Sequence, residues 1–145
     1  MVHLPGWLSW ALAEHANNVK ELVGSEHNPR ILEYFKATSL KASEDETSWC
    51  SAAVNYAFWE CGLKGSGLAN ARSWLTWGSE ITFRLGAVAV FWREDPKSWK
   101  GHVGFALAEY DDQVTLLSPN DGNRWRIKMY HKVQLLGYRW PKVLP

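Results

Sequence analysis

The chain has 145 residues, of which 46% are hydrophobic and 21% are charged, and this is the composition of an ordinary globular domain. The length suits one domain, and no apolar run approaches the roughly 20 residues that a membrane-spanning helix needs. The formal net charge is +1, but residues 122–145 hold six basic and no acidic residues, so the first 121 residues carry about −5.

Four helices are predicted in the first half of the chain. The first covers residues 4–17, and the second begins at Asn28, a good N-cap, with Pro29 at the first helical position. A third helix runs from about residue 47 to residue 61, and residues 69–77 form a short fourth helix.

The third helix has the clearest amphipathic pattern. Its apolar positions recur at i, i+3, i+4, i+7, i+8 and i+11, and they are Cys50, Ala53, Val54, Ala57, Phe58 and Cys61. Gly62 suits the position just after the last turn. Cys50 is therefore expected on the inward face of the first turn.

The second half of the chain has the pattern of short strands separated by turns. Five strands are predicted, over residues 86–92, 102–109, 113–117, 123–129 and 134–140. Helices followed by a strand meander predict an α+β domain in which N-terminal helices pack on an antiparallel sheet of about five strands. We expect a single catalytic domain over residues 1–145, with a helical part at about 1–80 and a sheet part at about 81–145.

The two cysteines, Cys50 and Cys61, are not expected to form a disulfide. On one helix they lie about 16 Å apart along the axis at 1.5 Å per residue, whereas a disulfide needs Cα atoms within roughly 7 Å. Two cysteines at this spacing also lack the other ligands of a zinc site. No metal is expected.

Cys50 allows two readings, a buried apolar thiol or a nucleophile. If Thr47 is the N-cap, Cys50 occupies position N3, where the positive end of the helix dipole lowers a thiol pKa and favours the reactive thiolate. Cys61 lies at the opposite end, where the dipole raises the pKa, and it is interpreted as structural.

His102 is the best candidate for the base that a cysteine nucleophile needs. It alone among five histidines lies between a glycine and the start of an apolar strand, in Gly101-His102-Val103-Gly104-Phe105. Asn120, just past the next strand, is the candidate that orients its imidazole, and Asp121 competes for this role. A plain turn at residues 120–122 remains the alternative.

Several motifs together resemble one known group of enzymes. Trp49-Cys50-Ser51-Ala52, Gly101-His102-Val103-Gly104 and Leu135-Leu136-Gly137-Tyr138-Arg139-Trp140-Pro141 are similar to the papain-like cell-wall hydrolases of the NlpC-type and CHAP superfamily. The likeness is to a compact, endolysin-like phage and prophage subgroup, and it covers nearly the whole chain. Residues 28–31, 45–47, 71–75 and 86–88 also match its habits.

The resemblance implies a papain-like fold and a peptidoglycan hydrolase. Cys50 would be the nucleophile, His102 the base and Asn120 the third member of the catalytic set, acting on an amide bond of the stem peptide. Trp49 is expected to wall the substrate groove. Asp45 and Glu46 are expected either to meet substrate amines or to cap the helix. No cofactor is needed.

A phage endolysin is the expected setting. The N-terminus lacks the basic start of a secretory signal, so we expect synthesis in the host cytoplasm without a cleavable signal and action on the periplasmic wall. The expected partner is bacterial peptidoglycan, bound by a monomer that neither binds nucleic acid nor inserts into membranes. The bond that is cut stays open between amidase and endopeptidase cleavage.

Three other readings of the sequence remain. The chain would be an antibacterial secretion-system effector amidase, or a non-enzymatic module whose ten tryptophans include a glycan-binding groove. The basic C-terminal segment would bind a polyanion such as nucleic acid or an anionic wall polymer, or it would be the solvent side of the last strands.

Overall fold

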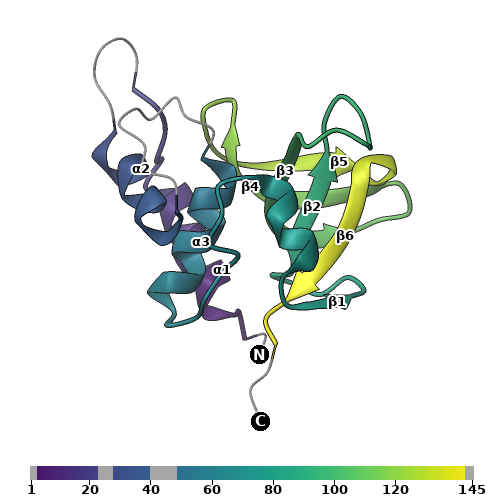
Figure 1. The fold of residues 1–145 in the computed structure, drawn as a ribbon, viewed down its shortest axis with the longest axis horizontal. Coiled ribbons are helices and arrows are strands. Elements are labelled where there is room, and N and C mark those ends of the chain that lie inside the picture. The colour runs from purple at the N-terminus through teal and green to yellow at the C-terminus, as the bar shows by residue number, and fades with distance from the viewer. Residues whose placement is uncertain (1–2, 23–27, 40–48, 143–145) are drawn as a thin grey trace.

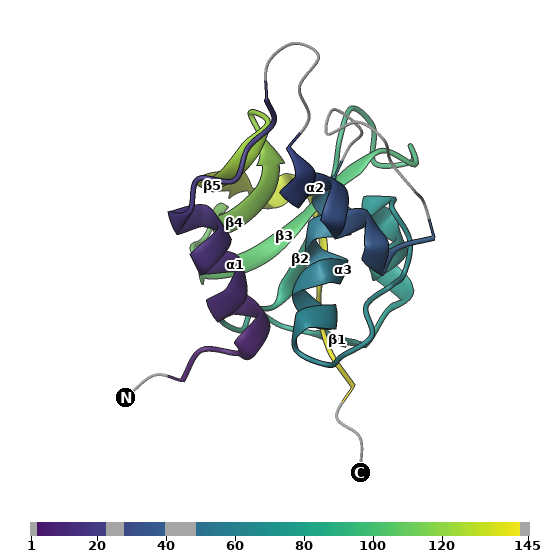
Figure 2. The same ribbon diagram turned by 90° about the vertical axis from the view of Figure 1, so that its left-hand side faces the viewer.

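The computed structural model describes residues 3–22, 28–39 and 49–142, and these form two layers (Figure 1). One layer is helical, with α1 (Gly6–Ala16), α2 (Pro29–Tyr34) and α3 (Cys50–Glu60), and with the short 3₁₀ helices η1 (Phe35–Ala37) and η2 (Ala71–Thr76). Figure 2 shows the three α-helices in front of strands β2, β3 and β4 of the second layer. The fourth helix, predicted over residues 69–77, is the 3₁₀ helix η2.

The second layer is an antiparallel sheet with strand order β1-β6-β2-β3-β4-β5. Its strands are β1 (Ser79–Ile81), β2 (Val88–Trp92), β3 (Gly101–Glu109), β4 (Gln113–Asp121), β5 (Arg124–His131) and β6 (Leu135–Trp140), with a 3₁₀ turn, η3 (Lys132–Gln134), before β6. The predicted α+β class and antiparallel sheet are confirmed. The predicted number of strands, five, is corrected to six, because β1 also pairs with β6.

Two helix starts show how the local sequence sets the fold. At α2 the Asn28 side chain accepts a hydrogen bond from the Arg30 amide at 2.9 Å, and Pro29 is the first helical residue, as predicted. The start of α3 differs from the prediction, because Trp49 is the N-cap and Cys50 occupies N1 rather than N3. Thr47, the predicted cap, lies outside the described residues.

The central strands of the sheet, β2, β3 and β4, are buried on both faces. Residues that alternate along β2, β3 and β4 point to opposite sides, as strand geometry requires. The helix-side core contains Val90, Val103 and Phe105 from the sheet, and Phe58 of α3 meets Phe105 with ring centroids 6.0 Å apart. A second core on the far side contains Phe91 together with Ala89, Ala106, Leu116 and Tyr138.

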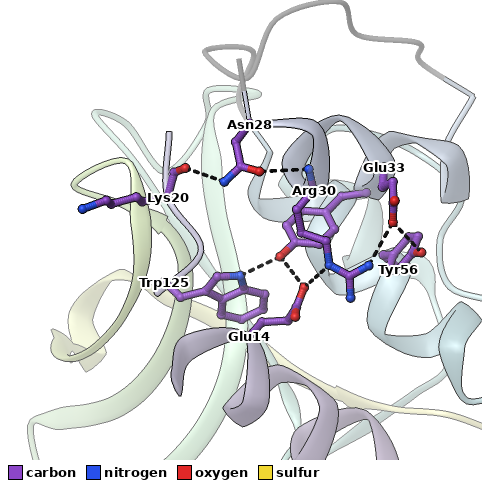
Figure 3. Close-up of polar contacts among 8 residues, drawn as sticks. Glu14, Lys20, Asn28, Arg30, Glu33, Tyr56 and Trp125 are labelled. Atoms are coloured by element: carbon purple, nitrogen blue, oxygen red, sulfur yellow. Dashed lines mark hydrogen bonds and ion pairs between the residues drawn. The ribbon is translucent and has the colours of Figure 1, made fainter. Parts of the chain in front are cut away.

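A polar cluster inside the helix-side core joins α1, α2 and β5 (Figure 3). Glu14 is 5% exposed and accepts hydrogen bonds from Arg30 Nε at 2.6 Å and from Tyr34 Oη at 2.8 Å. Tyr34 Oη in turn accepts from the indole N–H of Trp125 at 3.1 Å. Burial alone would lower the pKa of Arg30, but Glu14 raises it above its ordinary value.

Candidate active site

Cys50 is the first residue of α3 and is 3% exposed, within the helix-side core. Neither Cys50 nor Cys61 forms a disulfide, as predicted. Cys61 is the C-cap of the same helix and is exposed. Burial, followed by the charge of Glu60, raises the pKa of the Cys61 thiol, in the direction that was predicted.

Hydrogen bonds to η2 and to the segment just before it fix the start of α3. Ser51 Oγ donates to the carbonyl of Leu68 at 2.7 Å and accepts from the indole N–H of Trp74 at 2.9 Å. The amide of Ala53 bonds to the carbonyl of Trp49 at 2.9 Å, which closes the first turn. The backbone next to Cys50 is therefore held by the side chain of Ser51 and by the first hydrogen bond of the helix.

The same 3₁₀ helix also fixes the loop that leads into β3. The Arg72 guanidinium donates to the carbonyls of Lys100, Pro96 and Asp95 at 2.8, 2.7 and 2.9 Å. A Cβ on Gly101 would lie 2.8 Å from the carbonyl oxygen of Phe91, so only glycine fits there. Through these hydrogen bonds η2 links the start of α3 to the start of β3, where His102 is the second residue.

The imidazole of His102 lies on the far face of the sheet, away from α3. His102 pairs with Phe91, a member of the far-side core, and is 1% exposed. Its ring stacks on Tyr130 with centroids 5.5 Å apart and planes 3° from parallel. Cys50 belongs to the helix-side core. The structure therefore does not bring the thiol and the imidazole together.

Hydrogen bonds fix the tautomer of His102. Arg93 Nη2 lies 3.0 Å from Nδ1, and because arginine has only donors, Nδ1 must be the acceptor. The ring proton is then on Nε2, which lies 2.5 Å from Ser118 Oγ and donates to it. Ser118 Oγ is 3.0 Å from Tyr130 Oη, and Tyr130 donates to the Asp121 carboxylate. In this series of hydrogen bonds each donor therefore points away from Arg93 and toward Asp121.

This environment keeps the imidazole neutral. The pKa of His102 is lowered to about 3, mainly by burial and then by the positive charge of Arg93, while the negative charge of Asp121 opposes the shift. Both ring nitrogens are engaged in hydrogen bonds. In this arrangement the ring has no lone pair available to accept a proton from another group.

Neither candidate for the third residue is a hydrogen-bond partner of His102 in the part of the chain that the structure describes. Asn120 has a φ of 57° where the β4–β5 register shifts, and its side chain forms no hydrogen bond with any described residue. Asp121 is 8% exposed and reaches the imidazole only through Tyr130 and Ser118. Asp121 also lies 3.7 Å from Arg126 and 3.9 Å from Lys128, so part of the basic C-terminal charge is neutralised within the chain.

The direct partners of His102 were not among the predicted site residues. The pairs Phe105↔Leu117 and Ala106↔Leu116 bring Ser118 across from Gly104, on the face that His102 shares. Counting back from the turn would have placed residue 119 there, because a bulge between Ala106 and Ala108 shifts the register by one residue. Arg93 and Tyr130 carry no signal in the sequence, because a loop and a neighbouring strand supply them.

The predicted substrate-binding residues divide into one that is buried and two that cannot be placed. Trp49 is completely buried, with its ring 5.8 Å from Tyr34 and 6.4 Å from Trp125 and its indole N–H donating to Glu21 at 3.1 Å. The structure places it in the core and not on a groove wall. Asp45 and Glu46 lie outside the described residues.

Comparison of the chain with known protein families, with curated proteins and with solved structures gave no match. Over residues 3–22, 28–39 and 49–142, no group of three or more His, Cys, Asp or Glu residues is placed to hold a metal ion. Within the same ranges, none of the helices has the length and apolar character needed to cross a membrane.

Proposed function

We propose that this chain is a papain-like cysteine hydrolase that cleaves an amide bond in the stem peptide of bacterial peptidoglycan, as a monomeric phage endolysin. The observation that carries the proposal is the position of Cys50, the first residue of α3, held at the junction of the helical layer and the sheet. The positive end of a helix dipole favours the thiolate over the thiol. The choice of peptidoglycan as substrate comes from the resemblance of the motifs.

The chemistry assigned to Cys50 is acyl transfer. The thiolate attacks the carbonyl carbon of the amide, the C–S bond forms and the carbonyl oxygen becomes an oxyanion. Backbone N–H groups in the first turn of a helix have no acceptor within the helix, and those near Cys50 would stabilise this oxyanion. The C–N bond then breaks, the amine leaves with a proton, and water hydrolyses the thioester to a carboxylate and the restored thiol.

His102 is the proposed proton carrier, and Asn120 is its proposed orienting residue. To reach Cys50, the imidazole must leave Arg93 and Ser118 and turn to the helix side. Strand geometry allows this only if the pairs His102↔Phe91 and Gly101↔Trp92 open. These are the last two pairs of the β2–β3 ladder, and opening them must also break the hydrogen bonds that hold the buried imidazole.

Turbidity clearing of outer-membrane-permeabilised bacteria tests the proposal. We expect Cys50→Ala to slow clearing by at least about a thousandfold, because the nucleophile is lost, while Cys61→Ala, the matched control, clears like the wild type. Loss of clearing in His102→Gln supports the Cys50–His102 pair, and full clearing by this variant assigns the proton transfer to another group. Equal clearing by wild type and Cys50→Ala, or none by either, contradicts the hydrolase.

A glycan-binding module is the second candidate, and the orientation of His102 favours it. The ring of His102 faces the far core, on the other side of the sheet from Cys50, so the pair that a cysteine hydrolase needs is not assembled. This candidate predicts that the protein sediments with purified sacculi, releases no fragment from them, and binds equally well as Cys50→Ala.

A further inference from the structure

Two adjoining hollows lie at the C-terminal end of α3, with volumes of about 380 and 340 Å³. Both are lined by residues 63–65, so the two hollows adjoin along this segment. Trp77 and Lys142 line the larger hollow, and Trp59 and Lys36 line the smaller one. We call the combined feature the lysine–tryptophan groove. Its size falls within the range of small-ligand sites.

The charge of this groove is positive. The described residues that line it include Lys36, Lys64 and Lys142, all exposed, and none of these described lining residues is Asp or Glu. The last carbonyl groups of α3 are hydrogen-bonded, so their partial negative charge does not offset the charge of the lysines. The carbonyl of Phe58 accepts from the amides of residues 61 and 63, and the carbonyl of Trp59 accepts from the amide of residue 62. Ammonium groups around a concave apolar surface attract anions.

The groove also presents two indole rings. Trp59 is 52% exposed. Trp77 is half-buried, packs against Phe58 and Trp74 with centroids 4.8 and 4.7 Å away, and donates its N–H to the carbonyl of Lys64 at 3.0 Å. Large flat aromatic surfaces of this kind stack on sugar rings, while neighbouring polar groups set the orientation of the ligand.

The floor of the groove is rigid. Asn55 is 1% exposed, accepts from the amide of Gly67 at 2.7 Å and donates to the carbonyl of Leu68 at 3.2 Å. A Cβ on Gly65 would lie 2.3 Å from Asn55 Oδ1, and a Cβ on Gly78, whose φ is 62°, would lie 2.3 Å from the carbonyl oxygen of Trp140. A site that is already formed loses little conformational entropy when a ligand binds.

We infer that the lysine–tryptophan groove binds carboxylate-bearing peptidoglycan, with sugar rings on Trp59 and Trp77 and carboxylates paired with the three lysines. The identity of the polymer rests on the proposed function, whereas the preference for an anionic saccharide rests on the groove itself. Nine residues of helix separate Trp59 from Cys50, about 14 Å along the axis. The groove is therefore a binding site distinct from the thiol, and it would hold the polymer while another part is cleaved.

Co-sedimentation of the full-length Cys50→Ala protein with purified sacculi tests this inference without interference from hydrolysis. Adding Trp59→Ala, or replacing Lys36, Lys64 and Lys142 with glutamine, should weaken binding at least about tenfold, the loss of one good contact or more. Amidation of the sacculus carboxylates should weaken binding to the same extent. The matched controls Trp99→Ala and Lys97→Gln alter exposed side chains elsewhere and should stay within about twofold.

Three outcomes would overturn the inference. The first is groove variants that bind like the Cys50→Ala parent, with all proteins equally folded by circular dichroism. The second is binding that survives amidation of the sacculi. The third is binding only to walls that carry phosphate polymers, which would assign the lysines to phosphate. Failure of Cys50-dependent clearing alone would leave this binding result intact, so the two proposals can fail separately.

Discussion

The two faces of the sheet each enclose a polar network, and the two networks balance charge differently. On the helix side, the carboxylate of Glu14 is neutralised directly by Arg30 at 2.6 Å. On the far side, the cation Arg93 and the carboxylate of Asp121 are separated by three neutral side chains: His102, Ser118 and Tyr130. The first network is an ion pair that joins α1 to α2. The second contains the imidazole of His102, which burial keeps neutral.

The two networks therefore affect the stability of the fold in different ways. A buried ion pair gains its stability from both charges, so removing either one is costly. A buried neutral histidine instead makes folding sensitive to pH, because the unfolded chain binds a proton that the folded chain refuses.

Loss of Arg30 should have the largest effect on stability. Arg30→Met leaves the buried Glu14 carboxylate without its cation, and we expect the free energy of unfolding to fall by about 3 kcal/mol. Urea unfolding measures it. The control is Lys100→Met, whose pair with Glu94 is exposed and should cost less than about 1 kcal/mol. Equal losses in both variants would show that the helix-side pair is no stronger than a surface contact.

Acid should weaken the far-side network. The folded pKa of His102, about 3, lies below the ordinary value of 6.5, so its contribution to stability is intact above pH 6.5 and falls as the pH drops toward 3. Between pH 7 and 5 this should lower the free energy of unfolding by about 2 kcal/mol. His102→Gln should flatten the urea-derived profile by that amount, while Arg93, Asp121 and Lys128 contribute equally to both proteins. Parallel profiles would contradict the buried neutral imidazole.

The two tyrosines that donate to carboxylates provide a matched comparison. Tyr34→Phe removes a bond to Glu14 and leaves the Trp125 N–H without its acceptor, and we expect a loss of about 2 kcal/mol. Tyr130→Phe should cost about 1 kcal/mol, because Asp121 keeps Arg126 and Lys128 nearby. If urea unfolding showed a larger loss of unfolding free energy for Tyr130→Phe than for Tyr34→Phe, the far-side hydroxyl would be the more stabilising of the two, against this prediction.

Removal of Arg93 should have the smallest effect on stability and a clear effect on the imidazole. In Arg93→Gln the pKa of His102 should rise, because one of the charges that lowers it is gone. Nitrogen-15 NMR of the ring should show the Nε2–H tautomer in the wild type. An Nδ1–H tautomer in the wild type would refute the direction of the hydrogen-bond chain.

The sequence predicted the elements well where their periodicity was strong. The stripe from Cys50 to Cys61 placed α3 within a few residues, and Asn28-Pro29 marked the start of α2. β1 has three residues, too few to show an alternating pattern. The start of α3 was placed too early because Trp49 caps it without a side-chain hydrogen bond, which leaves no capping signature.

The face of His102 could not be predicted for a different reason. Val103 and Phe105 point to one core and Ala106 to the other, so β3 has no polar face that reveals its orientation. The same absence of a polar face made it natural to expect the imidazole beside Cys50. The identity of Cys50 as an inward-facing residue of the first helical turn needed only the helical period.

Digestion of purified sacculi followed by mass spectrometry of the released fragments is the most direct test of Cys50 as a nucleophile. Wild-type protein should release fragments in which one stem-peptide amide has gained the elements of water, and Cys50→Ser, which keeps the size of the side chain, should release essentially none. Identical fragments from both proteins, or no fragments from the wild type, would contradict the cysteine hydrolase.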